Sequence, residues 1–182
     1  MYHEFTPCAA LAPFIDKFWV FKGFTDIGTC FKILADGCTD FIFSIGNMTV
    51  PTDEHSMIMQ PYRSYFVGPM RVYSDLTATT NTLHMLGVRF HPCGLAAFTN
   101  EPLGQFADLR IQSSDINLLF DNAFAEMLCE QPDDSVRIRI IEGYLIRLLT
   151  QSIQVDRQII YATSFIKQSR GQLPVQLSLI HI

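Results

Sequence analysis

The spacing of the apolar residues changes once along the chain, close to Ser113, and this change limits the folds open to it. Before that point apolar residues come in short runs that end at turn residues, as in β-strands. After it they recur every three to four residues, as on the buried face of an amphipathic helix. Strands first and helices afterwards predict an α+β fold, with an antiparallel β-sandwich or barrel followed by a helical hairpin.

The first part contains a succession of expected strands. They are 18–21, 31–34, 41–45, 65–67, 77–82 and 83–90. The turn Ala35-Asp36-Gly37-Cys38 between the second and the third predicts a hairpin. In the last strand, alternation predicts one face with His84, Leu86, Val88 and Phe90, and the opposite face with Met85, Gly87, Arg89 and His91. Pro92-Cys93-Gly94 ends this strand, and a short helix is expected at 95–98.

The second part predicts three helices. The first has Ser113 or Ser114 as its N-cap, and Ile116, Phe120, Phe124 and Met127 form its buried stripe. The second follows a break at 132–135 and turns its arginines, Arg137, Arg139 and Arg147, mostly outward. The third runs from about 156 to 169 and ends before Gly171. We therefore predict a β-rich domain over 1–112, a helical hairpin over 113–154 and the start of another domain over 155–182.

Composition excludes several classes of protein. The chain is 48% hydrophobic, which excludes intrinsic disorder, and it has no apolar run long enough to span a membrane. The N-terminus lacks the pattern of a signal peptide, so we expect a cytoplasmic protein whose five cysteines are free buried thiols. Residues 1–134 hold seven Lys and Arg against sixteen Asp and Glu, whereas 135–182 hold six against two. Only the second part therefore has the charge expected of a segment that faces a polyanion.

Motifs for catalysis or cofactor binding are absent from the sequence. His84 and His91 are seven residues apart, on opposite faces of one strand, so we expect no shared metal ion. Cys93 lies close to His91, but we interpret it as a core residue. We predict no catalytic residue, no metal and no cofactor.

Arg89 is the strongest polar candidate, because a strand arginine among apolar residues needs either solvent or a buried acid. Two interpretations stay open: a structural ion pair with Asp36 or Asp40, or recognition of an anion in a pocket. The two aspartates also suit plain turn chemistry beside Gly37. The aromatic residues would line an apolar cavity or fill an ordinary core equally well. The candidate ligand-binding residues are Arg89, Asp36, Asp40, His84, His91 and Trp19.

Several segments, in order and spacing, resemble the N-terminal sensor domain of AraC-type transcriptional regulators. They are Leu11-Ala12-Pro13-Phe14-Ile15 with Phe18-Trp19, ILADGCTDFIFSIG (33–46), Val67-Gly68-Pro69 and LGVRFHPCGLAAFTNEPLGQFAD (86–108). Ala35 stands where this branch of the family commonly has proline. The resemblance covers about residues 10 to 149. It implies a cupin-like β domain that holds a small effector, and helices that form a homodimer.

Residues 157–175 resemble the first helix, glycine turn and second-helix start of the DNA-binding module of the same family. The family continues with a Leu-Ala pair that would fall at 178–179, whereas this chain has Ser178-Leu179 and ends at Ile182. We expect that this chain alone does not bind DNA specifically, because base readout needs a recognition helix in the major groove. A truncation, a frameshift or a vector-encoded end would each account for such a tail.

Two functions follow as hypotheses. The first is the effector-sensing and dimerisation part of an AraC-type regulator, which would bind DNA only in the full-length protein. The alternative is a cupin-like small-molecule-binding protein or enzyme whose helical tail is only structural.

Overall fold

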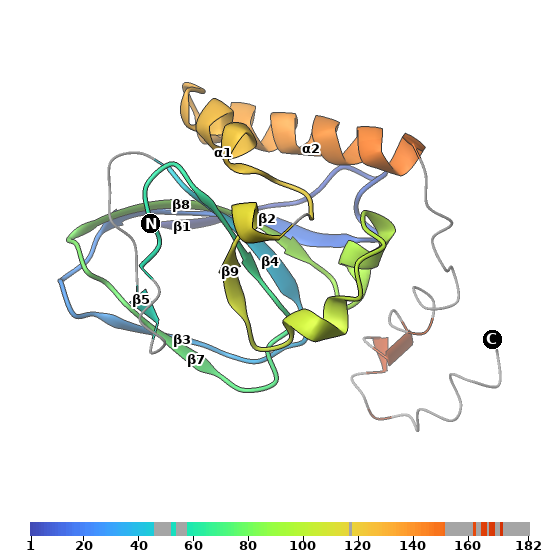
Figure 1. Ribbon diagram of the computed structural model, residues 1–182, viewed down its shortest axis with the longest axis horizontal. Helices are drawn as coiled ribbons and strands as arrows, with labels where there is room; N and C mark the ends of the chain where they lie inside the picture. Colours follow the sequence, from blue (N-terminus) through green and yellow to red (C-terminus); the bar gives the residue numbers. More distant parts are fainter. Residues whose placement is uncertain are drawn as a thin grey trace.

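The computed structural model describes residues 1–45, 52–53, 58–116 and 118–151, together with 162, 165–166, 168–169 and 172. It is an α+β fold in which two antiparallel β-sheets form a sandwich, and two helices cover the outer face of the larger sheet (Figure 1). The expected α+β class with an antiparallel sandwich is confirmed. Most of the expected third helix at 156–169, and nearly all of 155–182, lie outside the described residues, whereas 162, 165–166 and 168 are helical.

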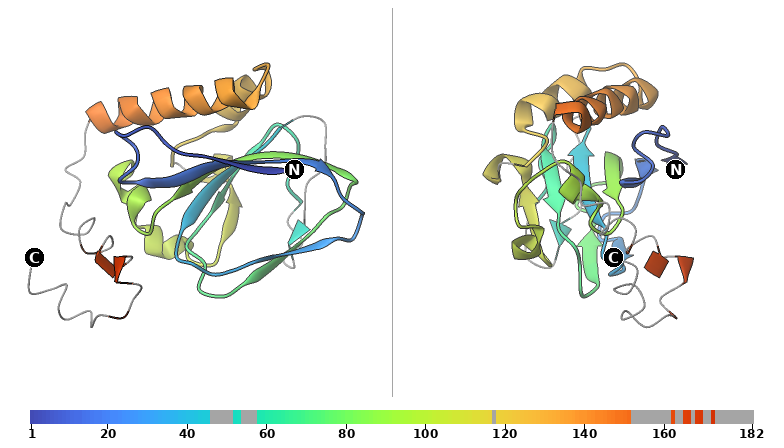
Figure 2. Two further views of the ribbon diagram at one scale, coloured as in Figure 1. Left: turned by 180° about the vertical axis from the view of Figure 1, so that it is seen from behind. Right: turned by 90° about the vertical axis from the view of Figure 1, so that its right-hand side faces the viewer.

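The larger sheet has the strand order β1-β2-β8-β4-β6-β9 and the smaller sheet the order β3-β7-β5. The strands of the larger sheet are β1 (Tyr2–Phe5), β2 (Ile15–Phe24), β8 (Thr82–Phe90), β4 (Thr39–Ser44), β6 (Ser64–Val67) and β9 (Arg110–Gln112). Those of the smaller sheet are β3 (Cys30–Ile33), β7 (Ser74–Thr77) and β5 (Thr52–Asp53). The two views of Figure 2 show the smaller sheet on the side of the larger sheet away from the helices.

Strand β4 lies inside the larger sheet, and all of its side chains are buried. Because neighbouring residues of a strand point to opposite faces, Phe41 and Phe43 point toward the helices while Asp40 and Ile42 point toward the smaller sheet. Strand β8 alternates in the same way, with Leu86 and Val88 in the core beneath the helices and Met85 and Arg89 on the other face. The alternation expected for 83–90 is therefore confirmed.

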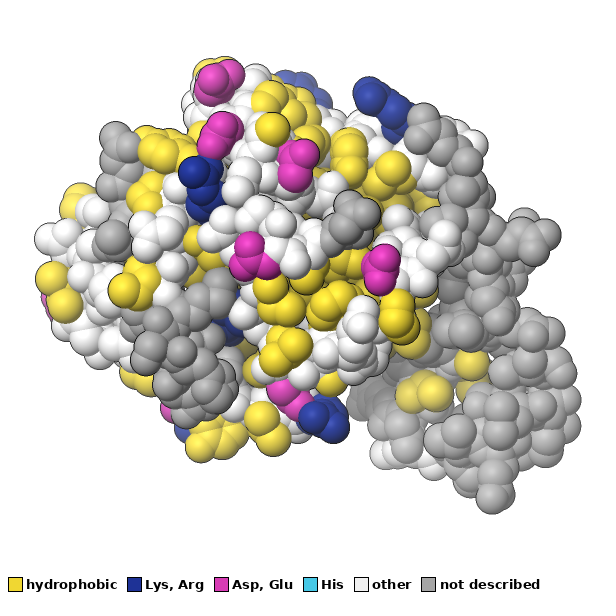
Figure 3. Space-filling model, viewed as in Figure 1, with side chains coloured by type: hydrophobic (Ala, Val, Ile, Leu, Met, Phe, Trp, Pro, Cys, Tyr) yellow, Lys and Arg dark blue, Asp and Glu magenta, His cyan; other side chains and the backbone are white. Residues whose placement is uncertain are grey.

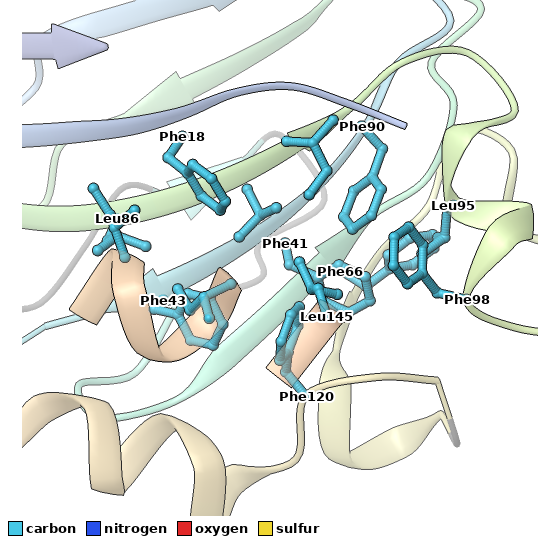
Figure 4. Close-up of a cluster of buried hydrophobic side chains, with 14 of the residues drawn as sticks. Phe18, Phe41, Phe43, Phe66, Leu86, Phe90, Leu95, Phe98, Phe120 and Leu145 are labelled. Atoms are coloured by element: carbon cyan, nitrogen blue, oxygen red, sulfur yellow. The ribbon is translucent and has the colours of Figure 1, made fainter. Parts of the chain in front are cut away.

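The main core lies between the larger sheet and the helices α1 (Asn122–Cys129) and α2 (Asp134–Gln151). Its aromatic side chains interlock (Figure 4). Phe120 is 1% exposed, and its ring centroid is 5.0 Å from that of Phe41 and 5.2 Å from that of Phe43, in edge-to-face contacts. Aromatic pairs of this geometry stabilise a core beyond the apolar area that they bury.

The first helix begins later than the sequence predicts. Residues Ser113–Asp115 form the single 3₁₀ turn η3, and α1 starts only at Asn122, after Asp121, whose side chain accepts a hydrogen bond from the Phe124 amide at 2.8 Å. The prediction of a helix from Ser113 was wrong because Phe120 belongs to a loop that places its ring in the core. Its spacing from Phe124 imitates a helical stripe, since both rings enter the same core.

The hairpin expected at Asp36-Gly37 is also absent. Strands β3 and β4 belong to different sheets, since β3 pairs with β7 and β4 pairs with β6 and β8. The turn carries the chain from one sheet of the sandwich to the other, and a turn motif alone does not specify the partner of each strand. No strand spans 77–82 as expected, because β7 ends at Thr77 and β8 begins at Thr82.

Arg137 is buried, contrary to the expectation that the arginines of α2 face outward. Its guanidinium donates hydrogen bonds to the carbonyls of Leu128 (3.0 Å) and Gln131 (2.6 Å) and to Asp134 (2.6 Å). The last carbonyls of a helix have no partner within the helix, and Arg137 supplies donors to the carbonyl of Leu128 near the end of α1 and to that of Gln131 in the turn after it. Arg139 and Arg147 are exposed as expected.

The cysteines are free thiols, as expected, but none of them is fully buried. Cys30 and Cys93 are exposed, and Cys93 has a φ of 63° in the turn before the 3₁₀ helix η1 (Gly94–Ala97), which accounts for the short helix expected there. The interpretation of Cys93 as a core residue was therefore wrong. A second 3₁₀ helix, η2 (Leu103–Phe106), leads to β9.

No helix within the described part of the chain is both long and apolar enough to cross a bilayer. On the face of the molecule seen in Figure 3, the described Lys and Arg side chains lie apart from one another.

Candidate functional site

A cavity of about 270 Å³ lies between the two sheets, on the side of the larger sheet away from the helices. Strands β2, β4 and β8 supply most of its floor, and Phe31, Ile33 and Leu76 of the smaller sheet face them. An engineered cavity of about 150 Å³ holds benzene, and natural ligand pockets begin at about 300 Å³. The cavity is therefore large enough for a substituted ring or a short branched chain.

One row of residues across the larger sheet carries the charged side chains of the cavity. Arg89 of β8 is paired with Asp40 of β4, Asp40 with Val67 of β6, and Val67 with Arg110 of β9. Residues directly opposite one another on antiparallel strands share a face, so all four side chains point into the cavity that they line. The row therefore has an arginine at each end, with one aspartate and one small apolar residue between them.

Asp40 is held by two donors. The indole Nε1 of Trp19 donates to its Oδ1 at 3.0 Å, and Nη1 of Arg89 donates to its Oδ2 at 3.0 Å. The side chain of Asp40 is 13% exposed. Burial raises the pKa of Asp40 from 3.8 to about 7, although the hydrogen bond from Trp19 acts in the opposite direction. The carboxyl therefore gains or loses its proton near neutral pH.

Arg89 also forms an ion pair with Asp36, whose side chain is 45% exposed. Asp36 begins the turn between β3 and β4, and its Oδ1 accepts a hydrogen bond from the amide of Cys38 at 3.0 Å. Gly37 has a φ of 71°, a conformation that suits glycine. The turn chemistry and the structural ion pair expected for these residues are both present, and they bring Asp36, Asp40 and Arg89 together.

The indole of Trp19 lies directly over Gly87. A Cβ atom at position 87 would come within 2.0 Å of the ring, so only glycine fits beneath it. Trp19 and Gly87 are directly opposite on β2 and β8, two residue pairs along from the charged row and on the same face of the sheet. Gly87 thus lets the indole lie flat on the sheet, where its Nε1 reaches Asp40.

The lining away from the charged row is apolar. Phe21 of β2 meets Phe31 of β3 edge to face, with ring centroids 5.8 Å apart, and Met85 and Leu83 continue along β8. Tyr2, which is 51% exposed, lies 6.3 Å from Trp19 between ring centroids, and Ile33 is 36% exposed. These two residues stand where the cavity meets solvent. Burial and the hydrogen bond that its hydroxyl donates to Glu4 raise the pKa of Tyr2 to about 12.

The structure brings four of the six candidate residues together, namely Arg89, Asp36, Asp40 and Trp19, and separates the two histidines from them. His84 lies on the helix face of β8, where its Nε2 is 3.0 Å from Asp134 at the start of α2. His91 follows the end of β8, and its Nδ1 is 3.5 Å from Asp16. Neither histidine lines the cavity.

Sequence reasoning did not single out Arg110 or Gly87. Arg110 begins β9, a strand of three residues that is too short to show alternation. Its Nη2 lies 3.4 Å from the hydroxyl of Ser74 on β7, so it reaches across from the larger sheet to the smaller one. The absence of a side chain at Gly87, on the same face as Arg89, was a visible signal of close approach by another group.

In the part of the chain that the structure describes, no three His, Cys, Asp or Glu side chains are arranged to hold a metal ion. The cavity itself presents an apolar surface, two guanidinium groups, one carboxyl whose pKa is raised to about 7 and an indole donor.

Comparison with known proteins places the greater part of the sequence in one family. Residues 3–112, which include both sheets except the first residue of β1 and every cavity-lining residue except Tyr2, match the family described as a domain of unknown function (DUF6597). No curated protein and no solved structure matches the chain.

Proposed function

The chain belongs to the DUF6597 family, and we propose that it binds a small molecule in the cavity between its two sheets as the effector-sensing part of an AraC-type transcriptional regulator. The observation that carries this proposal is the cavity, which is mostly apolar and has polar groups converging at one end. Pockets that bind small molecules have this character, because the apolar surface supplies affinity and a few polar groups fix orientation. The antiparallel sandwich of two sheets and the order of the sequence motifs support it.

A physical connection between the cavity and the helices also supports a sensing role. Strand β8 carries Arg89 on the cavity face and His84 on the helix face, where His84 contacts Asp134 of α2. A ligand that shifts β8 would therefore change the contact between His84 and Asp134 at the start of α2. Such coupling requires different ligand affinities for the two positions of the helix.

Dimerisation through the helical hairpin and DNA binding in a full-length regulator are further parts of this proposal. The homodimer is tested by analytical ultracentrifugation of the full chain, and a monomer at every accessible concentration would overturn that part.

The ligand-binding proposal is tested by a thermal-shift screen of the full chain against small metabolites. A ligand at about 100 times its dissociation constant adds roughly 2.7 kcal/mol to the free energy of unfolding. Trp19 is the sole tryptophan of the chain and lines the cavity, so its fluorescence reports binding at this site directly.

Two matched variants locate the binding site. Ile42→Phe adds bulk inside the cavity, and Ile146→Phe makes the same change at an exposed position of α2. We expect hits that stabilise Ile146→Phe but no longer stabilise Ile42→Phe, provided both variants keep the circular dichroism spectrum of the parent. A screen without any such hit would overturn the proposal.

A further inference from the structure

The charged groups at the polar end of the cavity are engaged with one another. Nη1 of Arg89 donates to Oδ2 of Asp40 at 3.0 Å, and Nη2 of Arg89 forms the ion pair with Asp36. The guanidinium of Arg110 contacts the hydroxyl of Ser74 on β7. Both terminal nitrogens of Arg89 are therefore already held by carboxylates of the chain itself.

The formal charges of this group balance. The two guanidinium groups, of Arg89 and Arg110, lie beside two carboxyl groups, of Asp36 and Asp40. A charge that leaves water needs a partner, because the lost hydration is costly. A ligand cation would meet both guanidinium groups, and a ligand anion would have to displace a carboxylate from Arg89. The group therefore favours an uncharged ligand.

Asp40 is the group in the lining that can bind a polar part of such a ligand. Within the described residues, its carboxylate accepts one hydrogen bond on each oxygen, from Nε1 of Trp19 and from Nη1 of Arg89. The two oxygens of a carboxylate offer about four acceptor positions. Because the side chain of Asp40 lines the cavity, a hydroxyl or N–H group of a ligand can donate a further hydrogen bond to it.

The rest of the lining defines the body of the ligand. The indole of Trp19 lies over Gly87, the ring of Phe21 continues this floor, and Phe31 faces it from the smaller sheet. Met85 adds a thioether. Aromatic and thioether groups make favourable contacts with a ring, and the volume of about 270 Å³ limits the ligand to roughly one ring with a short side chain.

We propose that the ligand of this cavity is an uncharged molecule with a single ring and a hydrogen-bond donor, whose hydroxyl or N–H group donates to Asp40 and whose ring lies against Trp19 and Phe21. This inference rests on the proposed function, because it names the chemical class of the molecule bound at the same site. The pairing of Arg89 with carboxylates of the chain excludes ions, and Asp40 selects the donor.

The absence of charge is tested with three probes of similar shape: 3-phenylpropan-1-ol, 3-phenylpropanoate and 3-phenylpropylamine. Each is titrated into the full chain at pH 8, where Asp40 with its pKa of about 7 is mostly ionised, while the fluorescence of Trp19 is recorded. We expect the alcohol to bind at least tenfold more tightly than the anion or the cation. An ion that binds as tightly as the alcohol would overturn the assignment of an uncharged ligand while leaving a ligand-binding cavity in place.

The hydrogen-bond donor is tested with an isomer of the alcohol, 2-phenylethyl methyl ether, which has the same atoms but no hydroxyl hydrogen. We expect the alcohol to bind at least fivefold more tightly than the ether at pH 8, because an ionised carboxylate accepts hydrogen bonds and donates none. An amide has one acceptor oxygen, so Asp40→Asn should reduce this preference to less than twofold. A preference that persists in Asp40→Asn, or none in the parent chain, would overturn the role given to Asp40.

Asp36→Asn tests why ions are excluded. It removes the charge of one partner of Arg89 and keeps a side-chain oxygen for the amide of Cys38. We expect the affinity for 3-phenylpropanoate to rise at least fivefold and that for the alcohol to stay within twofold. Asp108→Asn is the matched control, because Asp108 is the partner of Arg71 away from the cavity, and it should change neither affinity by more than twofold. An unchanged affinity for the anion in Asp36→Asn would overturn the pairing as the cause of exclusion.

The outcomes for the ligand class and for the proposed function are separate. The comparison of alcohol, ether and ions in the parent chain needs no variant, so it decides the ligand class even if Asp40→Asn does not fold. If none of the probes binds, the proposed class is overturned. The proposed function is overturned only when the metabolite screen also yields no hit at this cavity.

Discussion

The two faces of the larger sheet bury their side chains in different ways. The face beneath α1 and α2 is filled by interlocked rings such as Phe41, Phe43 and Phe120, each at most 1% exposed. The opposite face retains a cavity of about 270 Å³ and holds Asp40, Arg89 and Trp19 in a hydrogen-bonded group. Both faces come from the same strands, and alternate residues of β4 and β8 contribute to each.

This difference indicates that the helix face stabilises the fold and that the cavity face is suited to binding a ligand. Close packing of apolar groups stabilises a fold, because each lost contact leaves a void. Buried polar groups and unfilled space contribute little to stability, and they are characteristic of sites where a ligand completes the packing. The predictions below compare matched substitutions on the two faces.

Removing a ring should have the largest effect on the helix face. We expect Phe120→Ala to lower the free energy of unfolding by about 3–5 kcal/mol, since it leaves a void within the core. Phe21→Ala, which enlarges a cavity that already exists, should cost only about 1–2 kcal/mol. Urea denaturation of both variants measures the difference. Equal losses would mean that the two faces are packed to the same density.

One arginine from each face, Arg137 and Arg89, provides a second contrast. Arg137→Met leaves the carbonyls of Leu128 and Gln131 and the carboxylate of Asp134 without their donors, so we expect a loss of about 2–3 kcal/mol. Arg89→Met at pH 6 should cost less than about 1 kcal/mol, because Asp40, with a pKa of about 7, is largely protonated at that pH and leaves no unpaired buried charge. A greater loss for Arg89→Met than for Arg137→Met would reverse the roles given to the two faces.

Substitutions at two glycines test how much room the structure leaves for a side chain at each position. Gly87→Ala should destabilise the protein by about 1–3 kcal/mol and shift the emission of Trp19, because the new methyl group collides with the indole. Gly143→Ala in α2 has no atom within 4 Å of the new Cβ and should stabilise the helix by about 0.5–1 kcal/mol. Thermal melts and fluorescence spectra check both. Unchanged Trp19 emission in Gly87→Ala would contradict the position of the ring.

The two faces should also respond to pH in opposite directions. The pKa of Asp40 is higher in the folded protein than in the unfolded chain, so its contribution to stability is present at acid pH and is lost between about 4 and 7. The slope is at most about 1.4 kcal/mol per pH unit. Asp134 is the reverse case, because burial is outweighed by its contacts with His84 and Arg137, and its pKa is lowered. Its contribution is present above the ordinary pKa of aspartate and is lost on acidification.

Measurements of the free energy of unfolding between pH 4 and 8 distinguish the contributions of Asp40 and Asp134. Asp40→Asn should remove the loss of stability on going from pH 4 to 7, and Asp134→Asn should remove part of the loss below pH 4. The expected assignment fails if Asp40→Asn leaves the curve between pH 4 and 7 unchanged.

Alternation along 83–90 was enough to predict which residues of β8 face each way, and with them the position of Arg89 relative to Leu86 and Val88. The change of apolar period predicted the α+β class and the position of α2. Local turn chemistry predicted the bend at Asp36-Gly37, but not that it joins two sheets. The start of α1 was misplaced, because a loop that packs a side chain into the core and a helix can show the same apolar spacing.

The sequence by itself therefore determined the class of fold, the faces of the long strands and a short set of polar candidates. Only the tertiary structure decided that Arg110 joins Asp40 and Arg89 in one row, that Gly87 makes room for Trp19, that His84 contacts Asp134 and that Arg137 is buried. The physical reason is that periodicity follows from bonds along the chain. The pairing of β4 with β8 and of β6 with β9 depends on contacts between residues far apart in sequence, which local pattern does not encode.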